Sequence, residues 1–127
     1  MRRILVVDDD TSALGYIADI LRQRYEVVAV GSGDKALDVL DTGTPIDLLL
    51  TDIRMPGLNG IALARMAAIR RRELPIVYMS AFTEPALENV GTLLGPILTK
   101  PFTAEVLLDT VERTIATRRR EEAARRA

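Results

Sequence analysis

The sequence of 127 residues predicts an α/β protein built on a doubly wound, five-stranded parallel sheet. Short apolar runs alternate five times with longer segments. These longer segments either repeat apolar residues at helical spacing or are long enough to form a helix. The connections between them are short and contain turn-forming residues, which suits successive right-handed crossovers. For a five-stranded sheet of this class we expect the strand order 2-1-3-4-5.

The first strand, first helix and second strand follow from this pattern. Residues 4–7 are all apolar and are followed by three aspartates, which predicts a strand buried on both faces. Thr11 or Ser12 is the expected cap of a helix that ends near Arg24. The inner face of this helix is expected to carry Leu14, Ile17, Ala18 and Leu21. The β-rich residues 25–30 predict the second strand.

The second helix and the central strand come next. The turn at residues 31–33 predicts the start of a short helix that buries Ala36, Leu37 and Leu40. After a loop over residues 41–45, residues 46–52 form a largely apolar run that ends on Asp52, shortly before a Pro-Gly break. This run predicts a central strand that carries a carboxylate at its carboxyl end.

Two further units complete the predicted sheet. Asn59 is the expected cap of a third helix, whose inner face carries Ile61, Ala64 and Ala68. Residues 75–79 and 97–99 predict the fourth and fifth strands. Between them, residues 83–94 predict about three helical turns, weakened by Gly91 and by Gly95 directly after them.

The last helix is expected to begin at Thr103 and to bury Leu108, Val111 and Ile115. We expect one domain over residues 1–117 and a basic helical extension or tail over residues 118–127. Those last ten residues hold five arginines against two glutamates, a pattern typical of a solvated helix end. Because the extension could also form a dimer contact, the chain is expected to be a monomer or a homodimer.

The composition excludes several kinds of site. Hydrophobic residues make up 48% and charged residues 28%, which indicates a globular chain rather than a disordered one. The absence of Cys and His excludes disulfides, thiolate or imidazole metal sites and a histidine general base. With a net charge of −1, the chain is not expected to bind nucleic acid. No apolar run could span a bilayer, so we expect no membrane contact and a cytoplasmic location.

Four of the five predicted strands end on groups that can do chemistry. Asp8 and Asp9 follow the first strand, Asp52 ends the third, Ser80 follows the fourth and Lys100 follows the fifth. Parallel strands end at one edge, and strands one and three are adjacent, so the aspartates should cluster. Three close carboxylates repel one another unless a cation lies among them. Without His or Cys, the expected cation is Mg²⁺, with Mn²⁺ as a surrogate.

Together these groups are suited to binding a phosphoryl group. The metal ion and Lys100 would neutralise phosphoryl oxygens, and Ser80 would donate a hydrogen bond to one of them. Asp52 would then be the nucleophile and would form an acyl phosphate.

On these residues the sequence resembles the response regulator receiver domains of two-component signalling, the CheY-like family with a flavodoxin-like (βα)5 fold. The resemblance covers about residues 3–116. It rests on four motifs, which are specific in combination: Val6-Val7-Asp8-Asp9-Asp10, Leu50-Thr51-Asp52-Ile53-Arg54-Met55-Pro56-Gly57-Leu58-Asn59-Gly60, Met79-Ser80-Ala81 and Thr99-Lys100-Pro101-Phe102.

The resemblance assigns the phosphoacceptor and the metal ligands. Asp52 corresponds to the residue that is phosphorylated, and it also contributes to the metal site. Asp8 and Asp9 correspond to the acidic pair that positions Mg²⁺, Asp9 more directly. The backbone carbonyl of Arg54 corresponds to the third protein ligand.

The resemblance also implies how a signal would leave the site. Ser80 corresponds to the Ser/Thr that moves toward the phosphoryl group, and Lys100 to the lysine that pairs with it. The Lys100-Pro101 peptide is cis in many relatives. Many relatives carry Tyr or Phe three residues before the lysine, whereas this chain has Ile97. The ring-rotation half of the usual switch is therefore missing.

The expected function is that of a stand-alone receiver. It would take a phosphoryl group from a sensor histidine kinase or a phosphotransfer protein and present a changed interaction face to an unidentified downstream protein. It would catalyse only its own phosphorylation and dephosphorylation, so it is not expected to be a turnover enzyme.

Three alternatives stay open at this point. The first is a phosphorylation-independent binding module with a vestigial pocket. The second is a small Mg²⁺-dependent phosphohydrolase, for which the sequence offers neither a further acid/base nor a substrate-enclosing cap. The third is a DNA-associated module that acts through residues 118–127, in which no aromatic residues interleave with the arginines.

Two bulky residues are predicted to protect the phosphorylated form. Arg54 lies two residues after Asp52, and Phe82 lies two after Ser80. If both overhang the phosphoryl group, they shield it from water, which predicts slow hydrolysis.

Overall fold

The computed structural model describes residues 1–81 and 93–126. It contains a five-stranded, all-parallel sheet in the order β2-β1-β3-β4-β5, which confirms the predicted fold class and strand order. The strands are β1 (Arg3–Val7), β2 (Glu26–Val30), β3 (Leu48–Asp52), β4 (Ile76–Ala81) and β5 (Ile97–Lys100). The helices are α1 (Thr11–Leu21), α2 (Gly33–Asp41), α3 (Gly60–Arg70) and α4 (Ala104–Arg126).

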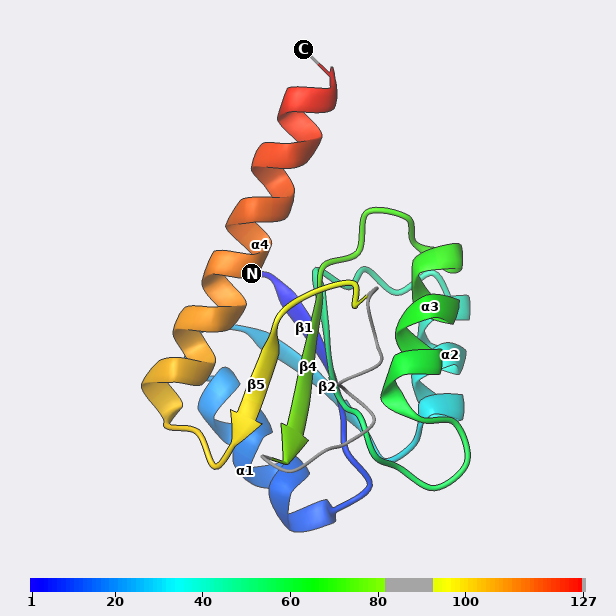
Figure 1. Ribbon diagram of the computed structural model, residues 1–127, viewed down its shortest axis with the longest axis vertical. Helices are drawn as coiled ribbons and strands as arrows, with labels where there is room; N and C mark the ends of the chain where they lie inside the picture. The colour runs from blue at the N-terminus through cyan, green and yellow to red at the C-terminus, as the bar shows by residue number, and fades with distance from the viewer. Residues whose placement is uncertain (82–92, 127) are drawn as a thin grey trace.

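The sheet separates two apolar cores. Helices α1 and α4 cover one face, and α2 and α3 cover the other (Figure 1). Along β1 the side chains alternate between the cores: Ile4 and Val6 face α1 and α4, whereas Leu5 and Val7 face α2 and α3. This two-sided burial explains why the central strands are apolar at nearly every position, since each buried Leu, Ile or Val contributes about 1.5–3 kcal/mol.

The first helix begins on a different cap from the one predicted. Asp10, rather than Thr11 or Ser12, is the N-cap: its carboxylate accepts hydrogen bonds from the backbone N–H groups of Ser12 and Ala13, at 2.9 and 3.3 Å. An aspartate in extended backbone directly before the helix satisfies two donors that Thr11 and Ser12 cannot reach from inside it. The helix ends at Leu21, earlier than predicted, and a turn leads to β2.

Helix α3 is rotated from the predicted orientation. Asn59 is its N-cap, as predicted. The buried face consists of Gly60, Leu63, Ala64 and Ala67, whereas Ile61 and Ala68 are only half-buried. Gly60 lies against the end of β3, where a Cβ atom would come within 2.1 Å of the Asp52 carbonyl oxygen. This approach sets the face, because residues three, four and seven positions after Gly60 then point at the sheet.

The last helix is a single element of 23 residues. Thr103 caps it through a hydrogen bond of 3.1 Å from the Val106 N–H to its hydroxyl oxygen, as predicted. Its first half packs on the sheet through Leu107, Leu108, Val111 and Ile115. Its second half continues beyond the amino ends of the strands, so residues 118–126 extend the helix (Figure 1).

Most of the predicted helix over residues 83–94 lies outside the described residues, and residues 93 and 94 are not helical. Tyr78 of β4 lies in the core covered by α2 and α3 and is hydrogen-bonded to the segment that leads into β5. Its buried hydroxyl accepts a hydrogen bond of 3.2 Å from the Leu94 N–H.

We predict that Gly60→Ala lowers the free energy of unfolding by about 1–3 kcal/mol, because the new methyl group overlaps backbone atoms that cannot move freely. Urea unfolding measures the change. Gly15→Ala is the matched control, since a Cβ at this position in α1 meets nothing within 4 Å. The control should be neutral or stabilising by up to about 1 kcal/mol. Equal stability of Gly60→Ala and the wild type would contradict the prediction.

Candidate functional site

Three aspartates meet at the carboxyl edge of the sheet. Asp8, Asp9 and Asp52 each place one carboxylate oxygen within 4.8 Å of the other two. The pairing of β1 with β3 produces this cluster, because Val7 is in register with Thr51 and the next residues are Asp8 and Asp52. The predicted clustering of these carboxylates is therefore present in the fold.

Asp8 is the buried member of the cluster, with none of its surface exposed. Its backbone N–H donates to the Val30 carbonyl at 3.3 Å, which extends the β1–β2 ladder by one residue. Its Oδ1 accepts a hydrogen bond of 3.0 Å from the Asp10 N–H. Asp10 thus both starts α1 and orients a site carboxylate, a second role that the sequence did not indicate.

Lys100 lies between two of the carboxylates. Its Nζ is 3.5 Å from Asp8 Oδ2 and 3.4 Å from Asp52 Oδ2. Because β4 separates β5 from β3, the long lysine side chain reaches past one strand to make these contacts. One ammonium group among three carboxylates leaves an excess of two negative charges when all are ionised.

Asp52 has a raised pKa, and burial is its main cause. Burial raises the pKa of Asp52 from 3.8 to about 6; Asp8 also raises it, while Lys100 and a backbone hydrogen bond from Ile53 lower it. The ammonium group of Lys100 therefore only partly offsets the free-energy cost of ionising Asp52, whose side chain is only 14% exposed.

The cluster is suited to a hard divalent cation. Its donors are carboxylate oxygens, which Mg²⁺ prefers, and two positive charges would balance the excess negative charge. Arg54 is an exposed residue two positions after Asp52, and its carbonyl as a further ligand stays a prediction.

Ser80 lies on the strand next to Asp52. Met79 of β4 is in register with Asp52 of β3, and Ser80 follows Met79. Ser80 is 2% exposed, and its hydroxyl donates to the Ala81 carbonyl at 3.1 Å. Its predicted movement toward a phosphoryl group would exchange this local hydrogen bond for a new one. Phe82, the second predicted shielding residue, lies outside the described residues.

Two further features of the site were missed from the sequence. Thr51 is buried beside Asp52 and donates its hydroxyl to the Asp52 carbonyl at 2.9 Å. Gly60 allows the start of α3 to touch the same carbonyl. The glycine directly after the predicted helix cap Asn59 was the available signal for the contact at Gly60. For Thr51 the sequence indicated only a strand residue.

The Lys100-Pro101 peptide bond is cis. No helix among the described residues has both the length and the apolar character needed to cross a bilayer.

Comparison with known protein families gives a match over most of the chain. The family described as "Response regulator receiver domain" matches residues 4–112. The receiver protein CpdR of Brucella abortus is 32% identical over 118 residues, which cover 91% of this chain and 98% of that protein. The response regulator FleR of Pseudomonas aeruginosa is 34% identical over 114 residues, which cover 87% of this chain.

Several relatives are much longer than this chain. It spans 21% of the Arabidopsis thaliana regulator ARR14 and 24% of FleR. Among solved structures, a receiver protein from Sinorhizobium medicae superposes with a TM-score of 0.84 at 34% identity, covering 92% of this chain and 96% of that one. The chemotaxis protein CheY4 of Vibrio cholerae superposes with a TM-score of 0.79 at 27% identity, covering 90% and 98%.

We predict that Asp52→Asn stabilises the metal-free protein near neutral pH. The pKa of Asp52 is higher in the folded state, so its stabilising contribution is complete below about pH 4 and is lost as the pH rises through about 6. The variant should therefore gain up to about 3 kcal/mol over the wild type at pH 7.5 and little at pH 4.

Urea unfolding in EDTA between pH 4 and 8 measures this difference. Asp38→Asn, which removes an exposed carboxylate from α2, is the control and should follow the wild type at every pH. A stability gain for Asp52→Asn that is the same at pH 4 and pH 7.5 would show that charge is not its cause.

Proposed function

Because this chain belongs to the response regulator receiver domain family, we propose that it accepts a phosphoryl group on Asp52 in a Mg²⁺-dependent reaction. The donor is a sensor histidine kinase or a phosphotransfer protein, and the reaction takes place in the cytoplasm. The observation that carries the proposal is the position of the Lys100 ammonium, within 3.5 Å of the carboxylates of both Asp8 and Asp52.

The transfer is a substitution at phosphorus. An Oδ atom of ionised Asp52 attacks the phosphorus, a P–O bond forms, the P–N bond of the phosphohistidine breaks, and its electron pair returns to the imidazole nitrogen. A pKa of about 6 leaves Asp52 mainly ionised at neutral pH and so able to attack. A divalent cation held by Asp8, Asp9, Asp52 and the Arg54 carbonyl would supply positive charge next to the phosphoryl oxygens.

Lys100 contributes to both states of the site. Before transfer, its ammonium offsets the charge of Asp8 and Asp52. After transfer, the carboxylate of Asp52 has become an acyl phosphate, whose phosphoryl group carries a charge near −2. The ammonium is already within reach and pairs with an oxygen of this group, so little side-chain ordering is required.

The signal starts as this change in charge and in hydrogen bonding. Ser80 releases the Ala81 carbonyl and donates to the phosphoryl group instead, which alters the end of β4. The downstream target is a protein that distinguishes the two forms of this edge. Catalysis is confined to the domain's own phosphorylation and dephosphorylation, and Mn²⁺ substitutes for Mg²⁺.

We predict that acetyl phosphate or phosphoramidate adds one phosphoryl group to the protein only when Mg²⁺ or Mn²⁺ is present. Intact-mass spectrometry measures the gain. Asp52→Ala should abolish it, and Asp38→Asn should leave it unchanged because this exposed carboxylate lies on α2. Lys100→Ala should slow it, because one positive charge is lost beside the reacting oxygen. The absence of a mass gain in the wild type under all conditions would refute the proposal.

We also predict that Arg54→Ala shortens the lifetime of the phosphorylated form. Arg54 is exposed two residues after Asp52, where its side chain can limit the approach of water. The decay of the phosphorylated mass after removal of the donor measures the lifetime. Arg22→Ala, at the exposed C-cap of α1, is the control. Equal decay rates of wild type and Arg54→Ala would exclude shielding by this residue.

A further inference from the structure

A basic groove lies at the amino edge of the sheet, opposite the edge that carries Asp52. It has a volume of about 690 Å³ and is lined by residues that precede β1, β3 and β4 and by the second half of α4. Six arginines from three separate parts of the sequence line it, and we call it the arginine groove: Arg2, Arg70, Arg71, Arg72, Arg118 and Arg119. Against them stand three carboxylates, so its net charge is +3 in a chain whose net charge is −1.

Half of these arginines have no partner carboxylate among the residues that the structure describes. Arg2, Arg72 and Arg119 make no ion pair with any residue in the described part of the chain. By contrast, Arg70 pairs with Asp41 at 2.7 Å and Arg118 pairs with Glu121 at 3.7 Å. The charge of the groove is therefore available to a ligand.

Arg71 adds a fixed positive charge to the groove. Its guanidinium donates to the carbonyl oxygens of Leu40 and Thr44, both at 2.7 Å. These bonds hold the side chain in place without neutralising it, since carbonyl groups carry no net charge. Four of the six arginines thus keep an uncompensated charge.

The walls of the groove are held together and its floor is apolar. Arg125, near the end of α4, pairs with Glu73 of the connection before β4 at 2.8 Å. Ile46, Leu74 and Ile115 supply apolar lining, and the last two are almost completely buried. A volume of about 690 Å³ lies in the range of small-molecule sites, about 300–1,000 Å³.

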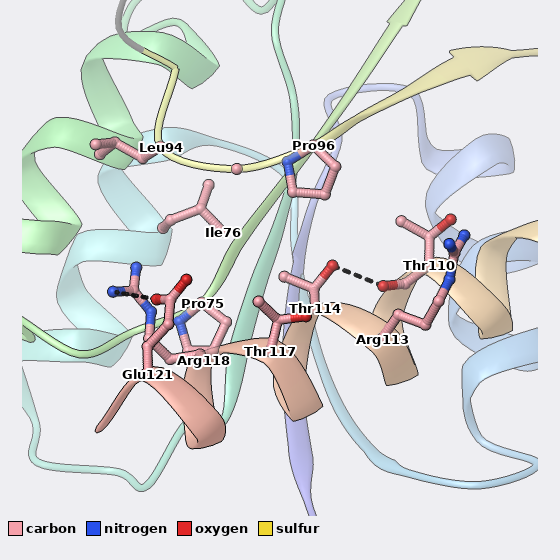
Figure 2. Close-up of a pocket in the computed structure, with 11 residues that line it drawn as sticks. Pro75, Ile76, Leu94, Pro96, Thr110, Arg113, Thr114, Thr117, Arg118 and Glu121 are labelled. Atoms are coloured by element: carbon pink, nitrogen blue, oxygen red, sulfur yellow. Dashed lines mark hydrogen bonds and ion pairs between the residues drawn. The ribbon is translucent and has the colours of Figure 1, made fainter. Parts of the chain in front are cut away.

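A neighbouring cavity lacks the same charge. It has a volume of about 380 Å³, lies on the other side of Arg118 and Pro75, and is lined by Thr110, Thr114 and Thr117 (Figure 2). Both of its arginines are paired: Arg118 with Glu121, as Figure 2 shows, and Arg113 with Asp109 at 2.8 Å. Uncompensated charge is thus a property of the arginine groove and not of every concave surface beside α4.

We propose that the arginine groove binds a small polyphosphate anion of nucleotide size, organic or inorganic. Planar guanidinium groups make paired hydrogen bonds with phosphate oxygens, and the net charge of +3 suits an anion with several phosphates. The apolar floor accommodates the organic part of a nucleoside polyphosphate. A concave site of about 690 Å³ favours such a compact anion over an extended polymer.

The test is titration calorimetry on the complete chain in EDTA, with adenosine triphosphate and with inorganic tripolyphosphate. We expect binding of at least one probe, and the ratio of the two affinities identifies the organic or inorganic source. The Arg72→Ala/Arg119→Ala double variant should bind about tenfold more weakly or worse, because two charge-assisted contacts are lost.

The matched control is Arg22→Ala/Arg120→Ala, which makes the same change in net charge at exposed arginines outside the groove. It should bind within about twofold of the wild type, since neither of those arginines lines the groove. Asp52→Ala should also retain binding, because none of its neighbours lines the groove.

Four results would overturn the proposal. They are no binding of either probe at millimolar concentration, equal losses in the two double variants, loss of binding in Asp52→Ala, and tighter binding of duplex DNA or polyglutamate than of both probes. The last result would identify a surface for a polymer in place of a small-anion site.

Discussion

The ammonium group of Lys100, held between the carboxylates of Asp8 and Asp52, is the interaction on which the carboxyl edge of the sheet depends. Without it, a buried carboxylate and a half-buried one would face each other without the ammonium group that contacts both. With it, the site still carries an excess of negative charge. A site in this condition favours a divalent cation. Burial raises the pKa of Asp52 to about 6, so this carboxylate is mainly ionised at neutral pH.

The backbone around this interaction is constrained closely. The β1–β3 register brings Asp8 and Asp52 to the same level, and Asp10 holds the Asp8 carboxylate while it caps α1. On the other side, Gly60 lets α3 begin in contact with the Asp52 carbonyl. The same residues therefore terminate strands, start helices and orient the charged groups, so folding and site formation cannot be separated.

Charge is divided between the two edges of the sheet. The carboxyl edge gathers Asp8, Asp9 and Asp52, and the amino edge gathers the six arginines of the arginine groove. The parallel topology makes this division possible, because all strands begin at one edge and end at the other. One small domain thus carries an acidic edge and a basic groove that share no residues, so a ligand at one would not compete directly with a ligand at the other.

The sequence by itself determined the elements described here, their order in the sheet and the clustering of Asp8, Asp9 and Asp52, because apolar periodicity is local and a parallel sheet collects strand ends at one edge. Only the tertiary structure decided which face of α3 is buried, which carboxylates Lys100 contacts and where the arginines of the arginine groove come together. The net charge of −1 gave no indication of the arginine groove, because it is a sum over the whole chain. Each of these depends on contacts between segments far apart in the chain, which local patterns do not encode.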